Sequence, residues 1–340
     1  MKPDGSSAVA LWLLVLVALA LAAALALLAT LFLRTPRVAT GRETFGDDAD
    51  ADADADIAGL ELVTDPEDLG RQQGLVEYFA GFSPCDVTAR EPLGCADEAG
   101  YLSALVTEPL PAAEADALAA AVQEAARRIR AAAGRSEASC SEAERPLRTF
   151  LAEAPSAAAR WRVAVLEDRA EGGWPHTHGD VVCLPRKTVR KLLTAGRRES
   201  DEVVETLVHE WVHVVQRARP DLARAVVVDA WGMTPRPLAD VVKNSQSVAH
   251  RVRSNPDLDG NVYARPGTDL ATVSLFPSEA AAERGGLAAA VVRSVDAESG
   301  MEVMDESSRV FSKGAPWLGY EHPYEAMAYK VASFAFQNPV

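Results

Sequence analysis

The chain has 340 residues, of which 48% are apolar and 24% are charged. This length is enough for one substantial folded domain with appended segments. The formal net charge of -15 argues against a nucleic-acid partner, because phosphate binding needs clustered lysine and arginine side chains that displace counterions. We therefore expect no nucleic-acid binding.

A long apolar stretch lies near the N-terminus. From Ala8 to Leu33 no side chain is charged, and almost every residue is Ala, Leu or Val. About 20 apolar residues suffice to cross a bilayer, whereas a cleavable signal peptide has an apolar stretch of roughly 7–15 residues. The sequence therefore predicts a retained transmembrane helix over 8–33, with the lipid bilayer as a partner and a single-pass membrane location. Positive charges flank both ends almost equally and leave the orientation open, with a lumenal or extracellular domain slightly favoured.

An acidic segment follows the apolar stretch. It contains an Asp-Ala repeat between Asp47 and Asp56, which has almost nothing to bury and repels itself. We interpret it as a flexible linker, and we expect the folded body to begin near Gly70. The predicted organisation is an N-terminal tail over 1–7, the transmembrane helix over 8–33, the acidic linker over 34–69 and one folded domain over 70–340.

Helical and strand patterns both occur in the folded body. Apolar residues recur at helical spacing over 112–133, and 161–166 alternates as a strand does. Because helices and strands are mixed without regular alternation, we expect an α+β domain. The remaining predicted elements are a loop over 172–179, a strand over 180–184, helices over 200–220 and 237–253, a turn over 255–260, strands over 271–276 and 287–295, and a last helix over 323–336.

Four cysteines are present, and none of them forms a C-x-x-C pair that would indicate a structural zinc site or a redox motif. In an oxidising compartment, Cys85 and Cys95 are the closest pair for a disulfide. In the cytosol, all four are expected to be buried thiols. The four residues are Cys85, Cys95, Cys140 and Cys183.

The candidate metal ligands and general base of the predicted helix over 200–220 lie in the sequence His209-Glu-Trp-Val-His213. Two imidazoles four residues apart lie one helical turn apart, so both can bind a single Zn²⁺ ion. Glu210 stands beside the first ligand, where it can act as general base toward a zinc-activated water. The non-functional alternative is a pair of partly buried histidines next to a carboxylate.

A catalytic zinc site needs a third protein ligand. The extended motif with a third histidine is absent, because Gln216 and Arg219 occupy the positions of its glycine and histidine. A carboxylate on a later helix remains, and the segment from Glu321 to Tyr329 supplies the best candidate, Glu325. Glu321, Asp229 and Glu283 are the alternatives.

These two segments resemble the gluzincins, thermolysin-like zinc metallopeptidases whose third ligand is a glutamate on a later helix. The resemblance implies a zincin-like domain with a small mixed sheet, an active-site helix and a later ligand helix. It assigns His209, His213 and Glu325 as ligands and Glu210 as the base, and it likens the segment 175–184 to the edge strand above the zinc. Thermolysin-like enzymes commonly have an aspartate four residues after the ligand glutamate, whereas this chain has Tyr329.

Hydrolysis of a peptide bond also needs a hydrogen-bond donor for the developing oxyanion. His178 and Tyr263 are the preferred candidates because both fall in predicted loops. The other candidates are His176, His250 and Tyr324.

The resulting hypothesis is a membrane-anchored zinc metallopeptidase that acts on a peptide or protein substrate. A zinc hydrolase for another amide is the nearest alternative within enzymes. A catalytically inactive, membrane-tethered binding or scaffold domain, with a structural zinc or no metal, is the alternative outside enzymes.

Overall fold

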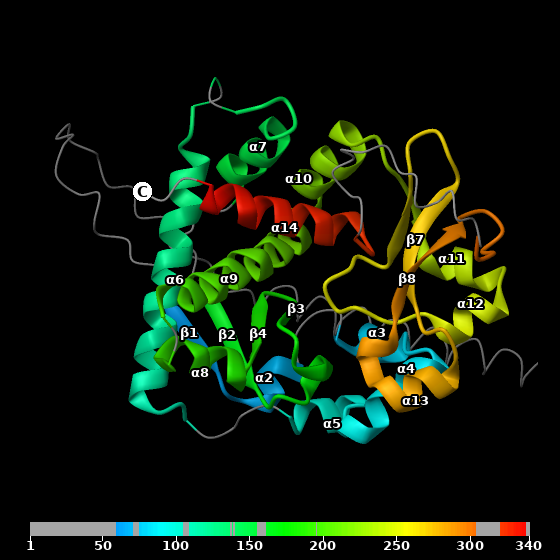
Figure 1. Ribbon diagram of the computed structural model, residues 1–340, viewed down its shortest axis with the longest axis horizontal. Coiled ribbons are helices and arrows are strands. Elements are labelled where there is room, and N and C mark those ends of the chain that lie inside the picture. Colours follow the sequence, from blue (N-terminus) through cyan, green and yellow to red (C-terminus); the bar gives the residue numbers. More distant parts are fainter. Residues whose placement is uncertain are drawn as a thin grey trace, which may run out of the picture. The chain divides into compact units, whose positions relative to one another are not determined.

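The computed structural model describes residues 59–70, 75–104, 109–136, 138, 140–154, 161–194, 196–303 and 320–337. All of them belong to the compact unit Asp54–Val340. Their architecture is mixed α/β, with two separate four-stranded sheets (Figure 1).

The first sheet has the strand order β1-β2-β4-β3. The first three of these strands run parallel, and β3 pairs antiparallel with β4 at the edge. Nearly every residue of β2 and β4 is buried, as is typical of central parallel strands that are covered on both faces. The strands are β1 (Leu60–Val63), β2 (Trp161–Leu166), β3 (His176–His178) and β4 (Val181–Pro185).

The second sheet is an antiparallel meander in the order β5-β6-β7-β8. Buried and half-buried residues alternate along β7, so one face of the strand contributes to a small separate core. The helices α11 (Leu238–Lys243) and α12 (Gln246–Arg251) add apolar side chains to this core. The strands are β5 (Thr234–Pro237), β6 (Asn261–Ala264), β7 (Leu270–Leu275) and β8 (Val291–Asp296).

Helix α9 (Arg197–Ala218) lies at the centre of the main core. It contacts β3, β4, α6 (Ala112–Ala133) and α14 (Pro323–Phe336), and Figure 1 shows it between α14 and the first sheet. Leu207, Val208 and Val212 are fully buried in these contacts. Packing on several sides holds the backbone of α9, and therefore its polar side chains, in one position.

The other helices are short and connect or cover the two sheets. The α-helices among them are α2 (Pro66–Gly70), α3 (Leu75–Ala80), α4 (Pro84–Arg90), α5 (Glu98–Leu102), α7 (Arg145–Glu153), α8 (Arg186–Thr194), α10 (Pro220–Arg224) and α13 (Glu279–Gly285). The 3₁₀ turns are η1 (Glu91–Leu93), η3 (Ala170–Gly173) and η5 (Gly286–Ala289), and η4 (Ala225–Ala230) is a π-helical turn.

The predicted elements over 112–133, 161–166 and 323–336 are confirmed with the same bounds. The single helix predicted over 237–253 is wrong, because the chain breaks at Ser245, whose side chain caps α12 by accepting a hydrogen bond from the Val248 backbone N–H. The loop predicted over 172–179 is also partly wrong. Its second half pairs with β4 and forms β3.

The expected fold class and the expected membrane location need correction. The domain is mixed α/β with two sheets, in place of one small mixed sheet behind a transmembrane helix. No helix among the described residues is both long enough and apolar enough to cross a membrane. Helices α6 and α9 have 22 residues each, which is enough length, but their outward faces are charged. The predicted span over 8–33 lies outside the described residues, and the single-pass membrane location that depended on this span is not retained.

The N-terminal boundary of the domain differs from expectation, and the cysteines match one of the two alternatives, that of buried thiols. Part of the predicted linker over 34–69 is ordered, because Leu60 in β1 pairs with Trp161 and α2 follows, so the fold begins before Gly70. All four cysteines are buried and free, and Cys85 forms no disulfide with Cys95.

A buried ionic network joins α4 to η3 beside the first sheet. The Arg90 guanidinium pairs with Asp86 and, at 2.9 Å, with Glu171, and it donates to the Tyr78 hydroxyl at 2.7 Å. The side chain of Arg90 is only 1% exposed. Burial opposes ionisation of Glu171, but Arg90 lowers the pKa of this carboxyl below its usual value. Arg90 thus supplies the positive charge that pairs with both the Asp86 and the Glu171 carboxylates.

We predict that Arg90→Met lowers the free energy of unfolding by about 3–5 kcal/mol, because two buried carboxylates lose their cation. Urea denaturation followed by circular dichroism measures this change. The matched control is Arg127→Met, which removes a half-exposed pair with Glu124 and should cost less than about 1 kcal/mol. Equal losses of unfolding free energy in the two variants would contradict the prediction that the buried network stabilises the fold more than the half-exposed pair does.

Candidate metal centre

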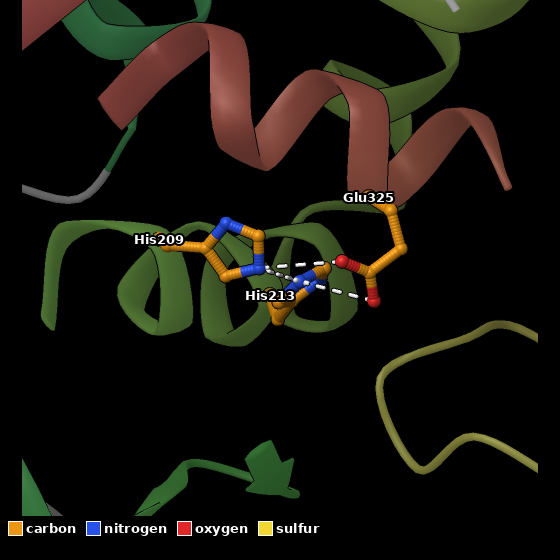
Figure 2. A group of neighbouring side chains, drawn as sticks. All are labelled: His209, His213 and Glu325. Carbon is orange, nitrogen blue, oxygen red and sulfur yellow. Dashed lines mark hydrogen bonds and ion pairs between the residues drawn. The ribbon is translucent and has the colours of Figure 1, made fainter. Parts of the chain in front are cut away.

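Two histidines of α9 and one glutamate of α14 converge on a single point. His209 and His213 are one helical turn apart, and Glu325 points toward them from the first turn of α14 (Figure 2). Their Nε2 atoms are 3.1 Å apart. The Glu325 carboxylate oxygens lie 3.3 Å from His209 Nε2 and 3.7 Å from His213 Nε2. Glu325 follows His213 by 112 residues in the sequence. The three predicted ligands are nevertheless neighbours in space.

The ligand atoms of these three residues lie close enough together to hold one metal ion. Zinc–nitrogen and zinc–oxygen bonds of about 2.0–2.2 Å place neighbouring ligand atoms about 3.3–3.5 Å apart. The two histidine nitrogens are 3.1 Å apart, and the two oxygens of the Glu325 carboxylate each face one of them, Oε2 at 3.3 Å from His209 and Oε1 at 3.7 Å from His213. Two imidazoles and one carboxylate are also a common donor set of catalytic zinc sites, with a fourth position left open. The residues present can therefore hold Zn²⁺.

The start of α14 explains why Glu325 reaches this point. Pro323 occupies a first-turn position, and the His322 side chain caps the helix by accepting a hydrogen bond from the Tyr324 N–H. Apolar residues of α14 such as Met327 and Val331 are fully buried in the core that α9 shares. The capped end is thus fixed over the two histidines.

The surroundings of the centre shift the pKa values of Glu325 and Glu210 in opposite directions. Burial opposes ionisation of Glu325, but His213 and His209 hold its pKa well below the usual range. Glu210 is 4% exposed, and burial together with Asp257 and Glu325 raises its pKa well above the usual value. A divalent cation on the ligands would oppose this increase by adding positive charge nearby. One Glu210 oxygen has no hydrogen-bond partner among the described residues.

A cavity of about 710 Å³ opens beside two of the predicted ligands, His209 and Glu325. This volume is within the range of about 300–1,000 Å³ that is typical of small-molecule sites. Glu210, His209 and Glu325 line it together with an apolar wall that includes Trp174 and Leu287. A substrate in this cavity would therefore meet the ligands and the base at the same place.

Three contacts support the predicted ligands, and the contact from Asn255 was missed by sequence reasoning. The Asn255 side-chain amide donates to Glu325 at 3.1 Å and to Glu321 at 2.6 Å. The Tyr329 ring lies 4.3 Å from the His209 ring, and Gln216 Oε1 lies 2.8 Å from His213 Nδ1. The helical spacing of Gln216 from His213 was a usable signal. Asn255 reaches the site only through tertiary packing, so the sequence carried no signal for it.

The structure does not bring the two preferred oxyanion candidates to the ligands. His178 is buried against the Tyr101 hydroxyl at 3.0 Å and lines a different cavity, of about 760 Å³. Tyr263 is 4% exposed and donates to Asp259 at 2.7 Å. Neither residue lines the cavity beside the ligands, which His176 and Tyr329 do line.

The alternative third ligands also lie apart from the histidines. Glu321 lines the cavity, but it interacts with Asn255 and, at 3.5 Å, with Arg253. Asp229 and Glu283 are exposed, and neither belongs to the group that could hold a metal. Glu325 is therefore the carboxylate that the geometry selects.

No protein-family model, no curated protein and no solved structure matches this chain. The resemblance to gluzincins therefore stays a prediction from two motifs, and the roles of the residues are argued from their geometry alone.

We predict that the full-length chain binds one Zn²⁺ ion and that Glu325→Ala weakens binding by more than the roughly 100-fold that loss of an outer-shell contact can cost. Competition with a chromogenic zinc chelator measures the affinity. Glu321→Ala is the matched control, because it removes a carboxylate one turn away that contacts neither histidine, and it should retain nearly normal affinity. The opposite ranking of the two variants would assign the ligand role to Glu321.

Proposed function

We propose that this protein is a zinc-dependent metallopeptidase of the gluzincin type. The observation that carries the proposal is the grouping of the His209, His213 and Glu325 ligand atoms within 4.8 Å of one another, next to a cavity that His209, Glu325 and Glu210 line. A peptide or protein is the expected substrate.

Zinc at these ligands would supply Lewis-acid polarisation of a carbonyl and would acidify water. The chain's own contribution to proton transfer comes from Glu210, a carboxyl group at the cavity wall that can accept a proton from the attacking water. Its raised pKa suits the second half of the reaction, in which the same carboxyl donates the proton to the leaving amine. One carboxyl thus serves as base and then as acid.

The environment of Glu210 favours an enzyme over an inactive scaffold. A buried carboxylate oxygen without a hydrogen-bond partner costs free energy. A binding or scaffold domain would gain nothing from placing a buried carboxyl group at the wall of an open cavity, whereas a general base must lie where a substrate can enter, and Glu210 lines the cavity beside His209 and Glu325. The arrangement therefore supports hydrolysis.

We predict that Glu210→Gln abolishes peptide hydrolysis, with a loss of about 10²–10⁴-fold or more in kcat, because the amide cannot accept the proton. Cleavage of a mixed peptide library, followed by mass spectrometry, measures activity. Zinc content should remain at one ion per chain, because Glu210 is not among the three ligands. Hydrolysis at the normal rate by this variant would contradict the proposal.

Tyr329 replaces His178 and Tyr263 as the expected oxyanion donor. Its side chain is half exposed in the cavity beside His209. Burial, together with Glu325 and Glu210, raises its pKa to about 12, so the hydroxyl keeps its proton at neutral pH.

We predict that Tyr329→Phe lowers kcat by about 10²–10³-fold with little change in zinc affinity, because one donor to the transition state is lost. Steady-state kinetics on a peptide identified in the library provides the measurement. Tyr263→Phe is the matched control, since this buried tyrosine is absent from the cavity lining, and it should leave kcat within a few-fold of normal. A larger loss of kcat for Tyr263→Phe than for Tyr329→Phe would favour Tyr263 as the oxyanion donor.

A further inference from the structure

The Gln216 side chain connects the two helices that carry the metal ligands. It lies on α9 three residues after His213 and is only 2% exposed. Its Oε1 atom is 2.8 Å from His213 Nδ1, and its Nε2 group donates to the Tyr324 backbone carbonyl at 3.1 Å. Tyr324 directly precedes the ligand Glu325 on α14. The Gln216 amide therefore contacts one predicted ligand, His213, and the residue next to another, Glu325.

The contact with α14 determines which way the amide points. A backbone carbonyl only accepts hydrogen bonds, so the group of Gln216 that faces Tyr324 must be the NH₂ donor. The oxygen of Gln216 then faces His213, and because this oxygen only accepts, His213 Nδ1 must carry the proton. In neutral imidazole the other nitrogen, Nε2, is left with a free lone pair. That nitrogen is the one that points at His209 and Glu325.

The two histidine ligands are supported in different ways. His213 is fully buried and hydrogen-bonded, whereas His209 Nδ1 has no hydrogen-bond partner among the described residues and its ring packs against Tyr329. A neutral amide also suits the position, because Glu210, Asp257 and Glu325 already place three carboxyl groups nearby. A fourth carboxylate would add repulsion in a buried site.

We propose that Gln216 is a positioning residue that sets the tautomer of His213 for metal binding and ties α14 to α9 at the site. The inference rests on the metal centre of the proposed function and does not depend on which bond is hydrolysed. Outer-shell partners of histidine ligands hold the ring orientation, and their loss typically weakens metal binding by about 10- to 100-fold.

The test measures zinc affinity and the histidine tautomer on the full-length chain. Gln216→Met keeps a similar side-chain length and removes both hydrogen bonds, so we expect the zinc Kd to rise by about 10- to 100-fold. Gln123→Met makes the same substitution on the exposed face of α6 and should leave the Kd unchanged. Circular dichroism checks that both variants are folded.

The tautomer is read from ¹⁵N chemical shifts of the metal-free, histidine-labelled chain at a pH where His213 is neutral. We expect His213 to be protonated at Nδ1, a result that does not require any variant to fold. Protonation at Nε2, or an unchanged zinc Kd in folded Gln216→Met, would overturn the role of Gln216. Failure of the unmodified chain to bind zinc would instead overturn the proposed function itself.

Discussion

The packing of α14 against α9 is the interaction on which the site depends. The two histidines come from a single helical turn, but the proposed zinc site also needs a third ligand that is held above them. Buried apolar residues of α14 and its capped first turn place Glu325 there. The free energy that fixes the ligand geometry is therefore hydrophobic burial in the shared core and not the ionic contacts among the ligands themselves.

The two sheets have different relations to this core. The first sheet contacts α9 through β3 and β4 and so supports the helix that carries the histidines. The segment between β5 and β6 carries Asn255, which bonds Glu325, and Asp257, which accepts two hydrogen bonds from Thr177 in β3. The loop thus joins the edge of the first sheet to the ligand carboxylate, and the cavity lies where these elements meet.

Burial shapes the acid–base character of the centre. Glu210 and Glu325 are both carboxyl groups near the same histidines, yet their pKa values move in opposite directions. Glu325 faces the imidazoles, which favour its charged form, while Glu210 faces Asp257 and Glu325, which oppose it. Two residues of similar chemistry can thereby take the separate roles of ligand and base.

The features of this protein that depend on local spacing can be predicted from the amino-acid sequence. The helices over 112–133 and 323–336, the strand over 161–166 and the convergence of His209 with His213 all follow from side-chain periodicity along one element. The proximity of Glu325 to the two histidines, the absence of His178 and Tyr263 from the cavity lining and the division of the strands into two sheets are visible only in the folded domain. These features depend on which distant elements share a core, and the local pattern of a single segment does not encode that choice.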